Sequence, residues 1–281
     1  MRPSPPLAPG TRVGLTTTIP VEVVLAANLS PVDLNNLFIA APDALAQVSQ
    51  AEAAGFPRTL CSWIKGIYTV VKSHPEIAAV IAACQGDCSN TQALGEILES
   101  EGLTIIHFKF PYPRDRQQLA GEIAALTDRL GTDPEAVARM QARLTPLRRH
   151  LRRLDRLTWK TGQVTGRENF QWLISSSDFG SDPVAYEQRL ATFLQEAEAR
   201  PAADGRVRLG FAGIPPIFTD LWDYMEESGA AVVFHEFPRQ FSMPYECPDL
   251  VDQYQRSTNP YDIRGRLADH QEAVATRRLD G

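Results

Sequence analysis

Three of the four cysteines in this chain are Cys61, Cys84 and Cys88, and the fourth is Cys247. Cys84 and Cys88 have C-x₃-C spacing at the end of an apolar run, and Gly86 between them predicts a loop that could wrap around a metal. Ligands collect at such strand ends in open α/β sheets. The sequence lacks the C-x₂-C pairs and the nearby histidine that a zinc site would need. The spacing therefore indicates either an unusual metal centre or cysteines buried as small apolar side chains.

Composition and charge narrow the class of protein. The chain has 281 residues, 43% hydrophobic and 22% charged, which is enough for two domains with buried cores. A net charge of -6 lacks the basic excess that favours nucleic-acid binding, and no apolar run is long enough to span a bilayer. The first residues do not resemble a signal peptide. We therefore expect a cytoplasmic protein, in which clustered cysteines are more often metal ligands or catalytic thiols than disulfides.

The order of apolar segments predicts an α/β fold with two flavodoxin-like, Rossmann-like parallel-sheet lobes and a helical insert. In the first lobe (residues 11–112) we expect strands within 11–20, 31–40, 75–84 and 103–111, and helices within 21–30, 41–54 and 91–102. The helical segment (113–204) should contain helices within 114–131, 133–160 and 182–201. The second lobe (205–281) should contain strands within 207–212 and 230–237 and helices within 218–229 and 259–281. A further strand is expected where the sequence stops, so we expect the second lobe to be short or truncated.

Other polar residues could also carry chemistry. His235 and Glu236, with Arg239 nearby, end a predicted strand and could do acid–base work, although polar surface groups are the interpretation that we favour. His107 lies between apolar residues of a predicted strand and is expected to be a core histidine. The segment GRENFQWLISSSDFG predicts either a substrate-binding loop or a capped helix end, through Glu168, Gln171, Trp172, Ser175, Ser176, Ser177 and Asp178.

A run of arginines stands beside a leucine stripe in the segment LRRHLRRLDRL. The pattern is typical of a solvated helix face, and the alternative is a patch for a phosphate-bearing ligand or an acidic partner. The arginines are Arg148, Arg149, Arg152, Arg153 and Arg156. The sequence contains no Walker A loop, no G-x-G-x-x-G after the first strand and no H-E-x-x-H, so ATP hydrolysis and NAD-linked hydride transfer are poorly supported.

Several segments resemble the 2-hydroxyacyl-CoA dehydratase family, which includes the 2-hydroxyglutaryl-CoA dehydratase D-component, benzoyl-CoA reductase subunits and double-cubane cluster proteins. The segments are TTTIPVEVVLAANLSPVDLNN, CSWIKG, GDCSNT and GRENFQWL. The likeness extends from about Arg12 to Gly281, and the cysteine segments are its most specific part. Asn28 replaces the usual glycine, which is a conservative change at a helix end.

The resemblance implies a 4Fe–4S cluster between the two lobes, with Cys61 and Cys88 as two of its ligands. A third ligand in the family comes from a strand end in the second lobe, which would lie just beyond Gly281. We therefore expect a fragment that lacks the C-terminal part of the subunit. Cys84, Cys247 or a partner could supply the third ligand instead. An apolar shell that includes Trp63, Ile64 and Ile81 would suit such a cluster.

The resemblance also implies a hydro-lyase that removes water from a 2-hydroxyacyl-CoA by radical elimination. One electron, supplied by a separate ATP-dependent activator, would have to enter at a potential in the lower part of the cluster range of about −700 to +450 mV. The implied partners are this activator, a homologous subunit or a second copy, and the acyl-CoA substrate. The alternatives are a benzoyl-CoA reductase-like or double-cubane-type reductase subunit and a degenerate homologue without catalysis. No catalytic residue is assigned.

Overall fold

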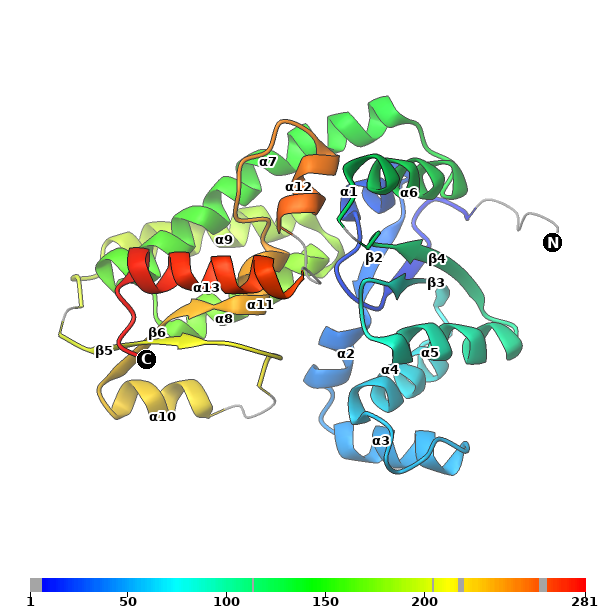
Figure 1. Cartoon of the computed structure of the whole chain (residues 1–281), viewed down its shortest axis with the longest axis horizontal. Coiled ribbons are helices and arrows are strands. Elements are labelled where there is room, and N and C mark those ends of the chain that lie inside the picture. The colour runs from blue at the N-terminus through cyan, green and yellow to red at the C-terminus, as the bar shows by residue number, and fades with distance from the viewer. Residues whose placement is uncertain (1–6, 113, 204, 217–219, 258–261) are drawn as a thin grey trace. The chain divides into compact units, whose positions relative to one another are not determined.

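The structure is a computed structural model that describes residues 7–112, 114–203, 205–216, 220–257 and 262–281 (Figure 1). The sequence positions before Leu7, and parts of the expected helices within 218–229 and 259–281, lie outside the described residues. Contacts between residues group the chain into two compact units, each of which is described by itself. Unit 1 comprises Met1–Ala142 and Pro248–Gln255, and unit 2 comprises Arg143–Cys247 and Arg256–Gly281.

Unit 1 is built on a parallel sheet of four strands in the order β2-β1-β3-β4. The central strands are short apolar runs that are buried on both faces, as is typical of parallel sheets covered by helices. The order is that of a flavodoxin-like, doubly wound fold, which confirms the predicted fold class. The strands are β1 Arg12–Leu15, β2 Ser30–Asp33, β3 Ile77–Gln85 and β4 Thr104–Lys109.

Helices cover both faces of this sheet (Figure 1). One face carries α2 Leu34–Ala40, α3 Ala44–Ala53, α4 Ser62–Ser73 and α5 Ser89–Ser100, and the other carries α1 Val21–Ala26 and α6 Arg116–Arg129. The apolar stripe of α5 packs on β3, and that of α4 joins the same core, because both sequences repeat apolar residues at helical spacing. This packing forms a core that includes Phe38, Ile64, Ile67, Val70, Val80, Leu94 and Leu98.

The prediction of an extended segment over residues 31–40 is wrong beyond Asp33. The Asp33 carboxylate accepts a hydrogen bond from the backbone N–H of Asn35 at 2.9 Å and thereby caps α2. The apolar run Leu34–Ala40 is therefore a short helix, and Asp33 is its N-cap. Asn28 follows α1 in the left-handed region, with φ of 56°, which fits the replacement of a glycine by asparagine at this helix end.

Unit 2 has a sheet of two parallel strands, β5 Val207–Phe211 and β6 Ala230–His235. Asp280 N donates to Arg208 O at 2.8 Å and Gly210 N donates to Gly281 O at 2.9 Å, so the last residues lie along the edge of β5 that β6 leaves free. The helices are α8 Gly166–Ile174, α9 Pro183–Glu198, α10 Leu221–Glu227, α11 Glu236–Phe241 and α13 Ile263–Arg277. Short turns of π-helix and 3₁₀-helix are Leu157–Thr161, Ser175–Ser177 and Phe179–Ser181.

Two helices contain residues of both units, α7 Pro134–Arg156 and α12 Leu250–Ser257. The part of α12 in unit 1 is held by Glu22, which is fully buried. Gln253 Nε2 donates to Glu22 Oε1 at 2.8 Å, and the Tyr254 hydroxyl lies 2.8 Å from Glu22 Oε2. The same hydroxyl accepts a hydrogen bond from Val21 N at 3.1 Å. These contacts attach a segment from late in the chain to the beginning of unit 1.

Replacing Tyr254 by phenylalanine should therefore destabilise unit 1. The substitution leaves the buried Glu22 carboxylate and the Val21 N–H short of a partner, which should lower the free energy of unfolding by about 1–3 kcal/mol. Denaturant unfolding followed by circular dichroism measures this change. Tyr112→Phe is the matched control, because Tyr112 is 74% exposed, and should stay within about 0.5 kcal/mol of the unmodified protein. Equal effects of the two substitutions would contradict the assignment.

Candidate functional site

The direction of the chain brings Cys61 and Cys88 to the same edge of the unit 1 sheet. Cys61 is the N-cap of α4, and Cys88 is the N-cap of α5. Helix α4 leads into β3 through a short connection, and α5 follows β3 after another. A helix that directly precedes or follows a strand runs antiparallel to it. Both helices therefore begin at the carboxyl end of β3, which is the edge where open α/β sheets bind ligands.

A cavity of about 230 Å³ lies between the segment that leads into α4 and the length of α5, from Asn90 to Glu101, and neither cysteine lines it. Leu60 and Ile64 line it from the side of Cys61, and Asn90 and Leu94 line it from the side of Cys88. Helices α4 and α5 also contact each other (Figure 1). Both cysteines are exposed and neither forms a disulfide. The site thus offers two accessible thiols at adjoining helix N-termini, where negative charge is favoured.

The turn before Cys88 requires glycine. Gly86 has a φ of 83°, and a Cβ atom at this position would lie 2.6 Å from the Cβ of Phe110. Only a residue without a side chain fits both the left-handed backbone and the close approach of Phe110. Next to it, burial raises the pKa of Asp87, and its carboxyl group lies 3.4 Å from the Thr91 hydroxyl. Gly86 therefore fixes the path by which the chain leaves β3.

The residues around Cys61 are held by buried contacts. Trp63 is half-buried, and its Nε1 donates to Asn35 Oδ1 at 2.5 Å, whereas Ile64 and Ile81 are buried. Lys65 is 1% exposed, and its Nζ lies 2.7 Å from Glu52 Oε1. A buried ammonium group needs such a partner to offset the loss of hydration. The ion pair therefore fixes the first turns of α4, which Cys61 precedes.

The other two cysteines are in different surroundings. Cys84 lies inside β3, where its thiol donates to Phe108 O at 3.4 Å and where burial raises its pKa. Cys247 belongs to unit 2. Among the residues that the structure describes, no group of three or more His, Cys, Asp or Glu side chains could hold a metal ion.

The preferred interpretation of His235 and Glu236 as surface groups is wrong, because both are buried. His235 is 1% exposed, its Nε2 lies 2.9 Å from Gly166 O, and burial lowers its pKa to about 4. Glu236 is fully buried and accepts hydrogen bonds from Arg266 at 2.6 and 2.9 Å and from Gly213 N at 2.8 Å. Burial opposes its ionisation, but the bonds from Arg266 and Gly213 outweigh burial and lower the pKa. Both side chains therefore form hydrogen bonds inside unit 2 and stabilise its fold.

The prediction of a buried His107 is also wrong. This residue is exposed on β4, and its Nε2 lies 3.8 Å from Glu99 Oε2. Strand β4 is at the edge of the described sheet, so its side chains are covered less completely than those of the central strands. The apolar residues on either side of His107 point to the opposite face, because neighbouring strand residues alternate.

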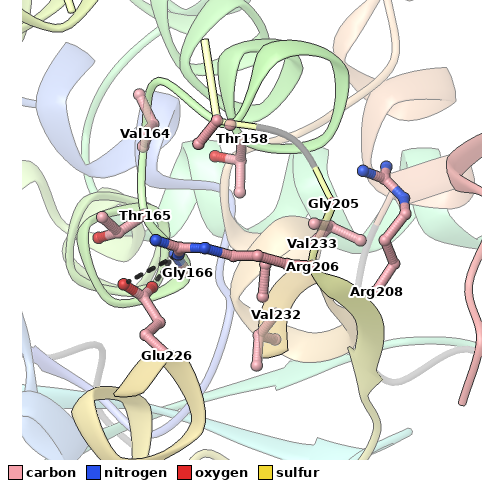
Figure 2. Close-up of a pocket in the computed structure, with 13 residues that line it drawn as sticks. Thr158, Val164, Thr165, Gly166, Gly205, Arg206, Arg208, Glu226, Val232 and Val233 are labelled. Carbon is pink, nitrogen blue, oxygen red and sulfur yellow. Dashed lines mark hydrogen bonds and ion pairs between the residues drawn. The ribbon is translucent and has the colours of Figure 1, made fainter. Parts of the chain in front are cut away.

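The GRENFQWL segment is a capped helix. Thr165 accepts a hydrogen bond from Glu168 N at 3.1 Å, and Glu168 Oε2 accepts from Thr165 N at 2.9 Å. Figure 2 shows Glu226 beside Gly166 and close to Arg206. The Glu226 carboxylate accepts a hydrogen bond from Gly166 N at 3.0 Å. The adjoining cavity measures about 40 Å³, which suits water rather than a substrate. The hydroxyl groups that follow, on Ser175, Ser176 and Ser177, donate to carbonyls of the preceding turn.

Fold and site together define a flavodoxin-like α/β protein with two exposed thiols at the carboxyl edge of a parallel sheet. The model of the family described as 2-hydroxyglutaryl-CoA dehydratase, D-component, matches residues 16–281, and the chain belongs to this family. The family is a dehydratase component that is generally associated with iron–sulfur clusters, and it implies partner components such as an activator and a companion subunit. A search of curated proteins gives no match. No described helix has both the length and the apolar character needed to cross a membrane.

The three cysteines of unit 1 should differ in their reaction with iodoacetamide. Cys61 and Cys88 are exposed, whereas Cys84 is half-buried and its raised pKa leaves less thiolate at neutral pH. Alkylation of Cys84 should therefore be at least about tenfold slower than that of Cys61 and Cys88 in the iron-free protein. Peptide mass spectrometry over a time course measures the three rates. A rate for Cys84 equal to the other two would show that β3 does not protect it.

Protonation of His235 should destabilise the folded chain in acid. Its folded-state pKa of about 4 lies below the unfolded value of 6.5, so the unfolded state binds the proton more tightly. Stability should be complete above about pH 6.5 and fall by about 3 kcal/mol as the pH decreases towards 4. Melting temperatures across this range, compared between the unmodified protein and His235→Gln, should show a smaller slope for the variant. The exposed His107→Gln is the control and should keep the full slope.

Proposed function

We propose that this chain is the iron–sulfur subunit of a 2-hydroxyacyl-CoA dehydratase-type enzyme, with Cys61 and Cys88 as two ligands of a 4Fe–4S cluster. The observation that carries the proposal is the position of both exposed thiols at the N-termini of α4 and α5, two helices that contact each other. Family membership supports the dehydratase activity, because the matched family is itself a dehydratase component. The acyl-CoA substrate, the activator, the companion subunit and the cytoplasmic location belong to the same proposal.

The chain's own residues would hold and orient the cluster ligands. The sulfur atoms of Cys61 and Cys88 would bind iron as thiolates, which is the form in which cysteine ligates metals. The Lys65–Glu52 ion pair and the turn at Gly86 would keep the two helix starts in place. Apolar side chains such as Leu60 on the cavity wall would limit the access of water.

When bound, a low-potential cluster would supply a single electron for the radical elimination of water from a 2-hydroxyacyl-CoA. The electron would come from the ATP-dependent activator. A third protein ligand would come from Cys84, from Cys247 or from another chain segment or subunit. Cys84 would have to give up its hydrogen bond to Phe108 O.

Anaerobic reconstitution with iron and sulfide tests the two ligands. The unmodified chain should become brown and bind both elements, whereas Cys61→Ser and Cys88→Ser should each lose most of the bound iron, because each removes a thiolate ligand. Iron and sulfide analysis with visible absorbance measures the result. Cys84→Ser is a matched control, because it removes a thiol from the same sheet edge, and iron retention there would exclude Cys84 as the third ligand.

Two outcomes would contradict the proposal. The first is a colourless, iron-free protein after reconstitution, with circular dichroism showing that the chain is folded. The second is unchanged iron content in both Cys61→Ser and Cys88→Ser. Either result would favour a homologue that has no cluster, and an assay of the reconstituted chain with activator, companion subunit and 2-hydroxyacyl-CoA would then show no loss of water.

A further inference from the structure

A second, larger cavity of about 530 Å³ lies within unit 2. Its wall includes Arg149, Arg152 and Arg156 from the last turns of α7, and these residues share one helix face because they are three and four positions apart. Arg239 and Glu246, which follow β6 in the chain, line it as well. The volume is in the range of small-molecule sites, which is about 300–1,000 Å³. The cavity is thus large enough for a ligand and is lined mainly by guanidinium groups.

Two of the nearby carboxylates already have arginine partners of their own. Asp155 accepts hydrogen bonds from Arg277 at 2.9 and 2.6 Å, and Asp269 accepts one from Arg239 at 2.8 Å. Burial opposes the ionisation of Asp155, but Arg277 outweighs it and lowers the pKa. These two pairs are therefore fixed parts of the unit 2 interior and do not neutralise the three arginines of α7.

Two of the three arginines of α7 share a single carboxylate, and the third has none in the described part of the chain. Glu246 Oε1 lies 2.8 Å from Arg152 and 3.5 Å from Arg149. Arg156 forms no hydrogen bond or ion pair with any residue that the structure describes. Burial lowers the pKa of Arg152. The positive charges of Arg149 and Arg148 lower this pKa further, whereas the negative charge of Glu246 raises it. Positive charge is therefore in excess on this wall, and an anion would relieve the repulsion.

A solvated helix face explains only part of this arrangement. Arg153, on the same stretch of α7, is exposed and pairs with Glu198, as expected of a surface arginine. Arg152, in contrast, has a side chain that is 20% exposed and faces the cavity. Arg239 has a buried Nε that finds no acceptor among the described residues. Arg152 and Arg239 thus present guanidinium groups in partly desolvated surroundings, where bonds to an anion are stronger than in water, whereas Arg149 and Arg156 reach the cavity from the exposed side of α7.

We propose that this cavity binds the phosphate groups of a small molecule through Arg149, Arg152 and Arg156. Guanidinium groups match phosphate oxygens in a bidentate geometry, and several on one helix face suit a diphosphate better than a single carboxylate. Coenzyme A and free nucleotides such as ADP both carry a diphosphate, and coenzyme A has a further phosphate on its ribose. The proposal concerns unit 2 alone and does not depend on iron binding at Cys61 and Cys88.

Calorimetric titration of the iron-free full chain at low ionic strength tests the site, with pyrophosphate as the probe of the shared chemistry. Arg156→Gln should weaken pyrophosphate binding by about tenfold, because it removes a charge-assisted bond. Arg153→Gln is the matched control, because Arg153 does not line the cavity, and it should bind as the unmodified chain does. Glu246→Gln should tighten binding several-fold, because it removes the competing carboxylate.

Parallel titrations with coenzyme A and ADP distinguish the source of the phosphates. Tighter binding of coenzyme A assigns the site to the thioester carrier, and equal or tighter binding of ADP assigns it to a nucleotide. The proposal is overturned if the folded chain binds none of the three probes. It is also overturned if Arg156→Gln and Arg153→Gln have equal affinities, or if Glu246→Gln fails to tighten binding. None of these results alters the iron content expected at the cysteines, so the two proposals fail independently.

Discussion

The direction of β3 is the constraint on which the candidate thiol site depends. The strand is buried at the centre of the sheet, and its neighbours β1 and β4 both run parallel to it. Helices attached to its two ends must therefore run the opposite way, so both start at its carboxyl end. Cys61 and Cys88 are far apart in the sequence, yet they share this edge because of that geometry. Reversing the direction of either helix would separate the thiols by the length of the strand.

Packing keeps the two helix starts in place. The apolar stripes of α4 and α5 share one core with β3, to which they contribute Ile67, Leu94 and Leu98, all almost fully buried. Burial of each such side chain contributes about 1.5–3 kcal/mol, more than any single polar contact near the site. The Lys65–Glu52 pair and the Gly86 turn then act locally, because they set the course of the chain within a turn of each cysteine. The helix positions thus come from the core, and the local contacts refine them.

The sequence was sufficient for the fold class and for most elements, because these depend on periodicity and caps. The helix expected within 133–160 is α7, and the Asp133 carboxylate accepts a hydrogen bond from Ala136 N at its start. Burial was harder to predict, because it depends on which strand is central and on what covers it. His107 lies on the edge strand and is exposed, whereas the buried Glu236 has partners that include Gly213, earlier in the chain, and Arg266, from a later helix. Sequence patterns carry no direct signal for such distant partners.

The candidate site shows the same division between local and distant information. The cysteine segments could be recognised from the sequence, and strand ends indicated a ligand-binding edge. The cavity of about 230 Å³ could not be predicted, because it requires the register between two helices that different loops connect to β3. The partial burial of Arg152 on α7 was also hidden, since helical spacing alone gives the same pattern for a solvated face. Only the position of Glu246, late in the chain, shows which arginines share a carboxylate.

The two units repeat one order of strand pairing. In unit 1, β1 pairs with β2 on one side and with β3 on the other. In unit 2, β5 pairs with β6 on one side, while Asp280 and Gly281 bond to Arg208 and Gly210 on the other. The last residues therefore occupy the place beside β5 that β3 occupies beside β1. In each unit, the first strand pairs with the next strand on one side and with a later segment of the chain on the other side. This shared order of strands and helices is what the periodicity of the sequence predicted as two flavodoxin-like lobes.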